Sequence, residues 1–159
     1  MSTTSPAEIA GRELGKDFGG KLIEPTDPSY DEARALFNAM IDKRPALIAR
    51  CATPDDVASV IRLAREHGFP LAIRGGGHNG GGLGSVDDGV VIDLSLMRSV
   101  SVDPSNRTVK VGGGATWGEV DAATHEHGLA VPCGVISSTG VGGLTLGGGI
   151  GHLTRAYGL

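Results

Sequence analysis

The sequence predicts an α+β fold in which helices pack on small mixed sheets. A short apolar strand, a well-signalled helix and a second strand follow one another between residues 46 and 74, which predicts both helices and strands in one domain. Apolar and polar side chains alternate on both sides of a turn in residues 100–111, which indicates a β-hairpin. Glycine makes up 27 of the 159 residues, and 21 of these glycines lie between Gly75 and Gly151. Because they lack a regular period and are mixed with strand and helix patterns, they indicate backbone that lies against something large.

The first forty-five residues carry the weakest signals. Residues 1–28 are polar and weakly patterned, so we expect an N-terminal arm or leading loop there and one domain over residues 29–159. A helix is expected at 29–42, ended by Pro45, because apolar residues recur there at helical spacing. The residues of this stripe are Ala33, Leu36, Phe37, Met40 and Ile41.

The next elements are better defined. Residues 46–51 are predicted to form a buried strand. A helix follows, with Thr53 as N-cap, Pro54 at the first helical position and Asp56 completing a capping box. Gly68 supplies its C-terminal stop. Residues 71–74 form a strand that runs directly into the first glycine-rich loop.

After that loop, the mainly apolar residues 90–94 are predicted to form another buried strand. Strands at 100–102 and 108–111 are joined by a turn containing Asp103 and Pro104. A capping box formed by Thr116 and Glu119 opens a helix that Gly128 ends. We expect a short strand at 129–131 and no regular element after the second glycine cluster.

Composition excludes several classes of function. A net charge of -4 with scattered basic residues argues against a nucleic-acid partner. Cys51 and Cys133 form neither a disulfide framework nor a zinc pattern. His125 and His127 are two residues apart on a helix, so they make a poor metal pair and we expect no metal site. Without an apolar run of membrane-spanning length or a signal peptide, we expect a cytoplasmic protein with no membrane partner.

The first glycine-rich loop follows Arg74 and contains Gly75, Gly76, Gly77, His78 and Asn79. Consecutive glycines expose backbone N–H groups that suit a phosphate or diphosphate, and Arg74 can add one charge. A flexible surface loop is the alternative. A nicotinamide-binding Rossmann motif also matches, with Asp93 near the ribose-binding position, but glycines at 80–82 and 84 do not open the helix that this motif needs.

The second glycine-rich loop spans residues 137–151 and combines small hydroxyl residues with glycines. Such a stretch lets backbone pass close to a flat, extended ligand while hydroxyl and N–H groups bond its polar edges. A lysine in the P-loop position is missing, so phosphoryl transfer is not supported. Tight packing of glycine against another backbone is the alternative.

These two motifs, in this order, resemble the PCMH-type FAD-binding domain of the vanillyl-alcohol oxidase superfamily, most closely its berberine bridge enzyme-like oxidoreductases. The match covers nearly the whole chain from about residue 28. It implies a PCMH-type fold whose two loops hold FAD between them. The contacts that it implies are Arg74, Gly75, Gly76, Gly77, His78, Asn79, Ser138, Thr139, Gly140, Gly142, Gly143, Leu144, Thr145, Gly148, Gly149, Gly151 and Tyr157.

The resemblance also implies a covalent cofactor. In the family, the histidine of the first loop commonly bonds to the 8α carbon of the flavin, and that position is His78. Some members add a cysteine four residues before the second loop's Gly-x-Gly-Gly run, where this chain has Ile136. Cys133 lies three residues too early, so we expect attachment through His78 only. His152 follows the second loop and is a weaker candidate for the border of the pocket.

The activity that the resemblance implies is hydride transfer from an alcohol or amine-type carbon of a small molecule to FAD, with oxygen as electron acceptor. The family carries a further FAD-domain segment and a substrate-binding domain beyond this stretch, and these supply most of the substrate pocket. We therefore assign no catalytic residue and expect these residues to be inactive alone. The alternative is a non-catalytic flavin-binding module or subunit completed by another chain.

Overall fold

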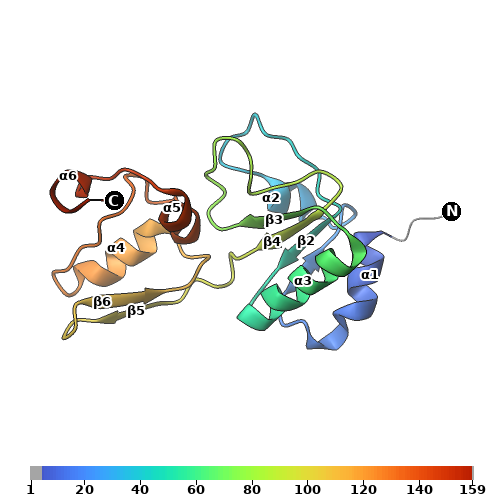
Figure 1. Ribbon diagram of the computed structural model, residues 1–159, viewed down its shortest axis with the longest axis horizontal. Helices are drawn as coiled ribbons and strands as arrows, with labels where there is room; N and C mark the ends of the chain where they lie inside the picture. Colours follow the sequence, from blue (N-terminus) through green and yellow to red (C-terminus); the bar gives the residue numbers. More distant parts are fainter. Residues whose placement is uncertain (1–4, 159) are drawn as a thin grey trace.

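The computed structural model describes residues 5–158. Within these residues a mixed sheet has the strand order β1-β2-β4-β3 (Figure 1). Its strands are β1 (Lys21–Ile23), β2 (Leu47–Arg50), β3 (Leu71–Arg74) and β4 (Val90–Asp93). β2 and β3 run parallel to β4, and β1 runs antiparallel to β2. The α+β class and the strands predicted at 46–51, 71–74 and 90–94 are confirmed.

Helix α3 (Pro54–His67) connects β2 to β3 and has the predicted ends. Thr53 accepts a hydrogen bond from the Asp56 N–H, the Asp56 carboxylate accepts one from the Thr53 N–H, and Gly68 closes the helix with φ 68°. Only glycine adopts this left-handed conformation without a steric penalty. No helix of residues 5–158 is long and apolar enough to cross a membrane.

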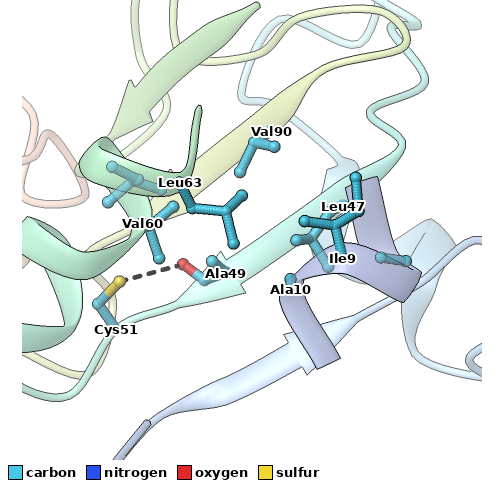
Figure 2. Packing of buried hydrophobic residues seen from close by; sticks show 10 residues of the cluster. Ile9, Ala10, Leu47, Ala49, Cys51, Val60, Leu63 and Val90 are labelled. Carbon is cyan, nitrogen blue, oxygen red and sulfur yellow. Dashed lines mark hydrogen bonds between the residues drawn. The ribbon is translucent and has the colours of Figure 1, made fainter. Parts of the chain in front are cut away.

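The main core lies between the sheet and helices α1 (Pro6–Glu13) and α3, which cover the same face of it (Figure 1). Figure 2 shows how the side chains from these elements interlock. Full burial of an aliphatic side chain contributes roughly 1.5–3 kcal/mol. The residues labelled there are Ile9, Ala10, Leu47, Ala49, Cys51, Val60, Leu63 and Val90.

The N-terminal segment differs from the expected arm. Residues 6–13 form α1, residues 15–17 form a 3-10 turn (η1, Gly15–Asp17), and residues 21–23 form β1. Ser5 and Glu8 make a capping box at the start of α1. Ala7, Ile9 and Ala10 are buried in the main core. The apolar stripe of α1 is short and consists largely of alanine, which is why the sequence pattern there is weak.

The helix expected at 29–42 is also wrong in its extent. Only α2 (Tyr30–Arg34) is helical, and Ala35 at its end is extended with ψ 140°. Phe37 and Met40, two members of the predicted stripe, are 66% and 90% exposed. The Asn38 side chain accepts a hydrogen bond from the Met40 N–H at 3.1 Å, a local bond that competes with helix formation. Residues 35–44 instead run as irregular chain.

The C-terminal half contains the predicted hairpin and helix. Strands β5 (Val100–Asp103) and β6 (Thr108–Val111) pair antiparallel, and α4 (Trp117–His125) packs beside β5 (Figure 1). Asp103 organises the turn by accepting hydrogen bonds from the backbone N–H groups of Ser105 and Asn106. The side chains of Ser105 and Asn106 also donate to Asp103, and all these bonds together lower the pKa of its carboxyl group to about 2.

Two expectations for the last thirty residues are wrong. Residues 129–131 form no strand, and the Leu129 N–H instead bonds the Thr124 carbonyl at the end of α4. Two short helices that were not expected follow, α5 (Val141–Gly147) and α6 (Thr154–Tyr157). α5 forms despite its glycines because tertiary contacts with the preceding loops override its poor helix propensity.

Candidate functional site

The two glycine-rich loops meet around one cavity of about 340 Å³. β3 delivers the first loop to one wall, and residues 139–148, which include α5, form the opposite wall. Most of the predicted contact residues therefore come together although the loops are far apart in the sequence. The predicted residues that line the cavity are Arg74, Gly75, Gly76, Gly77, His78, Asn79, Thr139, Gly140, Gly143, Leu144 and Gly148.

The first loop has backbone N–H groups that make no hydrogen bond within residues 5–158. None of the hydrogen bonds among the described residues has a backbone N–H of residues 75–80 as its donor. Just beyond them, the N–H groups of Gly81 and Leu83 both donate to the Asn79 side-chain oxygen at 3.1 Å. No helix opens after this loop, which confirms that it is not a Rossmann motif. A run of unpaired amide donors at a cavity is suited to an anion such as a diphosphate.

Arg74 has a structural role that the sequence did not reveal. Its guanidinium is buried, and Nη2 lies 3.0 Å from the Asp93 Oδ2 atom. Strand register causes this contact, because Arg74 on β3 and Arg50 on β2 both pair with Asp93 on β4. Arg50 Nε lies at 3.0 Å from the same oxygen. The charge of Arg74 is therefore largely satisfied inside the protein.

The state of Asp93 follows from this arrangement. Burial raises the pKa of its carboxyl group, but the Arg74 charge, the Ser95 N–H and the Arg50 side chain outweigh that effect. The net result is a pKa below the ordinary value, so the carboxylate is charged at neutral pH. Asp93 is thus the centre of a buried ion-pair cluster, in agreement with its predicted place on a strand.

Several glycines of the second loop serve tight backbone packing. A β-carbon on Gly140 would overlap the amide nitrogen of Gly76 in the first loop. One on Gly142 would lie 2.8 Å from the Gly113 carbonyl oxygen, and one on Gly151 would overlap the Cys133 carbonyl. The packing explanation that the sequence left open therefore holds at these positions. Gly143, by contrast, has open space around it and lines the cavity.

His78 joins the two loops through its side chain. Its Nε2 atom lies 3.0 Å from Ser138 Oγ, and Nδ1 lies 3.5 Å from Thr139 Oγ1. The ring also stacks on Phe37, with centroids 4.0 Å apart and planes inclined by 18°. His78 is partly exposed and lines the cavity. Its orientation is thus defined by contacts from two separate segments outside its own loop.

Other predicted residues lie away from the lining. Ser138 contacts His78, as described above, without lining the cavity itself. Thr145 and Gly149 belong to or follow α5, and Tyr157 lies in a second cavity beside the hairpin. His152 is exposed and also lies outside the lining.

The lining includes residues that were not predicted as contacts. Ile73 and Leu83 are exposed apolar side chains there, and they give the cavity apolar walls. Ile73 has a sequence signal, since alternation along β3 places it opposite the buried Ala72 and Arg74. No comparable pattern marks Leu83. The full set of these residues is Ile73, Leu83, Gly84 and Gly147.

Cys133 lies in a half-buried position outside this cavity lining. Burial raises the pKa of its thiol, and the Asp121 carboxylate, 3.9 Å from the sulfur, raises it further. Such a thiol is mostly protonated at neutral pH and is a weak nucleophile. The position four residues before Gly140 is occupied by Ile136, which is exposed.

Another cavity of similar size has the wrong charge for a phosphate ligand. It measures about 360 Å³ and lies between α1, η1 and α3. Its lining includes five carboxylates and one arginine, so its field repels anions. These charged residues are Glu13, Asp17, Asp55, Asp56, Arg62 and Glu66.

Comparisons with known proteins identify the family of the chain. The family model described as the FAD binding domain matches residues 45–159. The chain is 38% identical over 140 residues to (R)-6-hydroxynicotine oxidase of Paenarthrobacter nicotinovorans, covering 88% of this chain and 31% of that protein. It is 39% identical over 140 residues to an FAD-linked oxidoreductase of Bacillus subtilis, with the same two coverages.

Solved structures show the same fold. The crystal structure of 6-hydroxy-D-nicotine oxidase from Arthrobacter nicotinovorans superposes with a TM-score of 0.87 at 37% identity, covering 89% of this chain and 31% of that one. The structure of Phl p 4, a grass pollen allergen with glucose dehydrogenase activity, superposes with a TM-score of 0.84 at 29% identity. The match covers 97% of this chain and 33% of that one. The chain thus spans about a third of the length of these relatives.

Proposed function

The chain belongs to the FAD binding domain family, and from that premise we propose that its two glycine-rich loops hold FAD, with His78 as the covalent anchor. The loops supply backbone donors and small hydroxyl residues around one cavity. These features fit a ligand that combines a diphosphate with a flat ring. The protein's part is to bind, orient and electronically tune the cofactor.

The run of unpaired amides at residues 75–80 carries this proposal. Residues 75–79 of this run line the cavity, and Arg74 behind them is neutralised by Asp93. We infer that the diphosphate is bound mainly by backbone N–H groups rather than by a free cation. The apolar side chains of Ile73 and Leu83 suit contact with a flavin ring.

His78 is placed for attachment to the flavin. Its ring lies at the cavity and is held by hydroxyl groups of the second loop. Forming the link would break one C–H bond of the 8α methyl group and the N–H bond of the imidazole and would form one C–N bond. Both hydrogens would leave as protons, and the two electrons would pass to an acceptor such as oxygen. Ile136 and the protonated Cys133 support a single point of attachment.

For the longer protein we propose oxidation of an alcohol or amine-type carbon by hydride transfer to the bound flavin, with oxygen as acceptor. One relative is named as a hydroxynicotine oxidase and another as a glucose dehydrogenase, which supports both types of carbon. Most of the substrate pocket is then supplied by residues outside this FAD-binding part. If another chain supplies them, this chain is a flavin-binding subunit, and turnover requires the partner.

The test uses acid denaturation of the purified protein after loading with FAD. We expect flavin fluorescence to stay with the denatured wild-type chain and to be lost in His78→Ala. The mass of the wild-type chain should increase by that of FAD less two hydrogens. His125→Ala, which changes an exposed histidine on α4, is the control. Flavin that washes out of the wild type would reject the covalent link while keeping FAD binding. A colourless protein that cannot be reconstituted would reject the cofactor.

A further inference from the structure

We propose that Phe37 is a positioning residue that fixes the plane of the His78 imidazole at the cavity. This inference rests on the proposed role of His78 as the flavin anchor. Phe37 belongs to the irregular segment of residues 35–44, between α2 and β2, which contacts the first glycine-rich loop. We call this segment the strap.

The contact between the two rings is close and nearly parallel. Their centroids are 4.0 Å apart and their planes are inclined by 18°. The Phe37 N–H also donates to the carbonyl of Gly77, the residue before His78, at 3.3 Å. Backbone and side chain of Phe37 therefore hold the same short stretch of the loop.

Core packing does not explain this side chain. Phe37 is 66% exposed, and neither of the two buried core clusters includes it. Leaving an aromatic ring so exposed forgoes most of the stabilisation that burial would give. Its aromatic partner within residues 5–158 is His78.

The strap is anchored on both sides of Phe37, so the ring has a fixed base. Arg74 donates to the Ala35 carbonyl at 3.5 Å. Asn38 donates to the Gly80 carbonyl at 3.3 Å, and Lys43 donates to the carbonyls of Gly82 and Ser85 at 2.9 and 3.0 Å. Each of these bonds ties the strap to the first loop, to the residues that follow it or to the strand that leads into it.

Two kinds of contact then define the orientation of the imidazole. The Phe37 ring restricts tilting of the imidazole plane. Ser138 and Thr139, at the two ring nitrogens, restrict rotation within that plane. A nucleophile held in one orientation reaches its attack geometry more often than a rotating one. Loss of the Phe37 ring should therefore slow attachment of the flavin without removing His78.

The experiment compares Phe37→Leu with Phe37→Tyr in the full chain. Leucine keeps an apolar side chain, and tyrosine keeps the ring. Met40→Ala, at a 90% exposed position of the same strap, is the matched control. Two quantities are measured: the NMR shifts of the His78 ring protons in the apoprotein, and the rate at which acid-stable flavin fluorescence appears after FAD is added.

We expect Phe37→Leu to lose the upfield ring-current shift of the His78 protons and to attach flavin about two- to tenfold more slowly, the range that an aromatic pair energy corresponds to. Phe37→Tyr should restore both, and Met40→Ala should change neither. Unchanged shifts and rate in Phe37→Leu would overturn the inference. If the wild type attaches no flavin, the proposed covalent anchor is wrong. The positioning of His78 by Phe37 is tested separately, and it is wrong if the His78 ring protons have the same shifts in the wild type and in Phe37→Leu.

Discussion

Gly76 and Gly140 lie in direct backbone contact, and this contact joins the two glycine-rich loops. A β-carbon on either residue would overlap the amide nitrogen of the other. Gly140 also forms an antiparallel bridge with Thr116, just before α4. The hairpin and α4, which separate the loops in the sequence, thus also set the distance between them. The shape of the cavity between the loops therefore depends on two positions that have no room for a side chain.

Gly76→Ala should therefore damage both stability and cofactor binding. The added methyl group must push the loops apart, and overpacking of this kind costs about 1–3 kcal/mol. Separated loops no longer border one cavity, so we expect FAD to bind about tenfold more weakly or worse, a loss of about 1.4 kcal/mol or more. Urea unfolding and fluorescence titration with FAD measure the two effects.

Gly80→Ala is the control for that substitution. Gly80 lies in the same loop, but a β-carbon there meets no atom within 4 Å. We expect stability within about 0.5 kcal/mol of the wild type and unchanged FAD affinity. Equal losses in both variants would mean that the loop needs flexibility in general and not the contact with Gly140.

The Asp93 cluster predicts a specific response to acid. Because the pKa of Asp93 in the folded protein lies below its ordinary value of 3.8, the carboxylate stabilises the fold above pH 3.8. That contribution is lost as the pH falls below 3.8 through the folded-state pKa. Asp93→Asn should lose about 3–5 kcal/mol at neutral pH, since it leaves Arg74 buried without its charge partner.

The acid limb of the stability curve gives the second readout. Free energies of unfolding measured between about pH 2 and pH 7 should fall less steeply below about pH 4 in Asp93→Asn than in the wild type. Asp55→Asn, which removes an exposed carboxylate of α3, is the control for the loss of a negative charge. Parallel curves for wild type and Asp93→Asn would contradict the assignment of a lowered pKa.

Local signals in the sequence were enough for the best-defined elements. The capping box of Thr53 and Asp56 and the stop at Gly68 act within one turn of each end of α3, so both ends could be predicted directly. The Asp103 turn of the hairpin is equally local. The strap was misassigned as helix because its apolar residues have helical spacing, whereas its conformation is set by bonds to a loop about forty residues away.

In the candidate site, too, only local features could be predicted from the sequence. Runs of glycine indicated both loops, and His78 was an additional signal in the first loop. The burial of Arg74 against Asp93 depends on strand register, which places three strands side by side. The stacking of Phe37 on His78 depends on the path of an irregular segment. Neither relationship leaves a pattern at fixed spacing, so neither could be predicted.

Asp56 links the N-terminal segment to the rest of the fold, and its removal should be costly. Its buried carboxylate accepts hydrogen bonds from the backbone N–H groups of Gly19, Ala52 and Thr53, at 2.9, 2.9 and 3.0 Å. Asp56→Ala leaves these donors without their charged acceptor, and we expect a loss of about 2–3 kcal/mol in urea unfolding. Glu119→Ala removes the capping box of α4 and an exposed ion pair with Arg98, but no bond to a backbone N–H of a distant segment, and should cost about 1 kcal/mol. An equal cost for the two would show that the bonds to Gly19 and Ala52 add nothing to the capping box.

Cys133→Ser should leave the proposed covalent attachment of flavin unchanged. Burial and the nearby Asp121 carboxylate both raise the pKa of the Cys133 thiol, so little thiolate is available to attack the flavin. The Cys133 carbonyl also packs against Gly151, which resists the shift that would bring the sulfur to the cavity. Mass spectrometry of denatured protein should find the same flavinylated fraction in wild type and Cys133→Ser, and none in His78→Ala. Flavin that persists in His78→Ala and disappears only when Cys133→Ser is added would identify the cysteine as a second anchor.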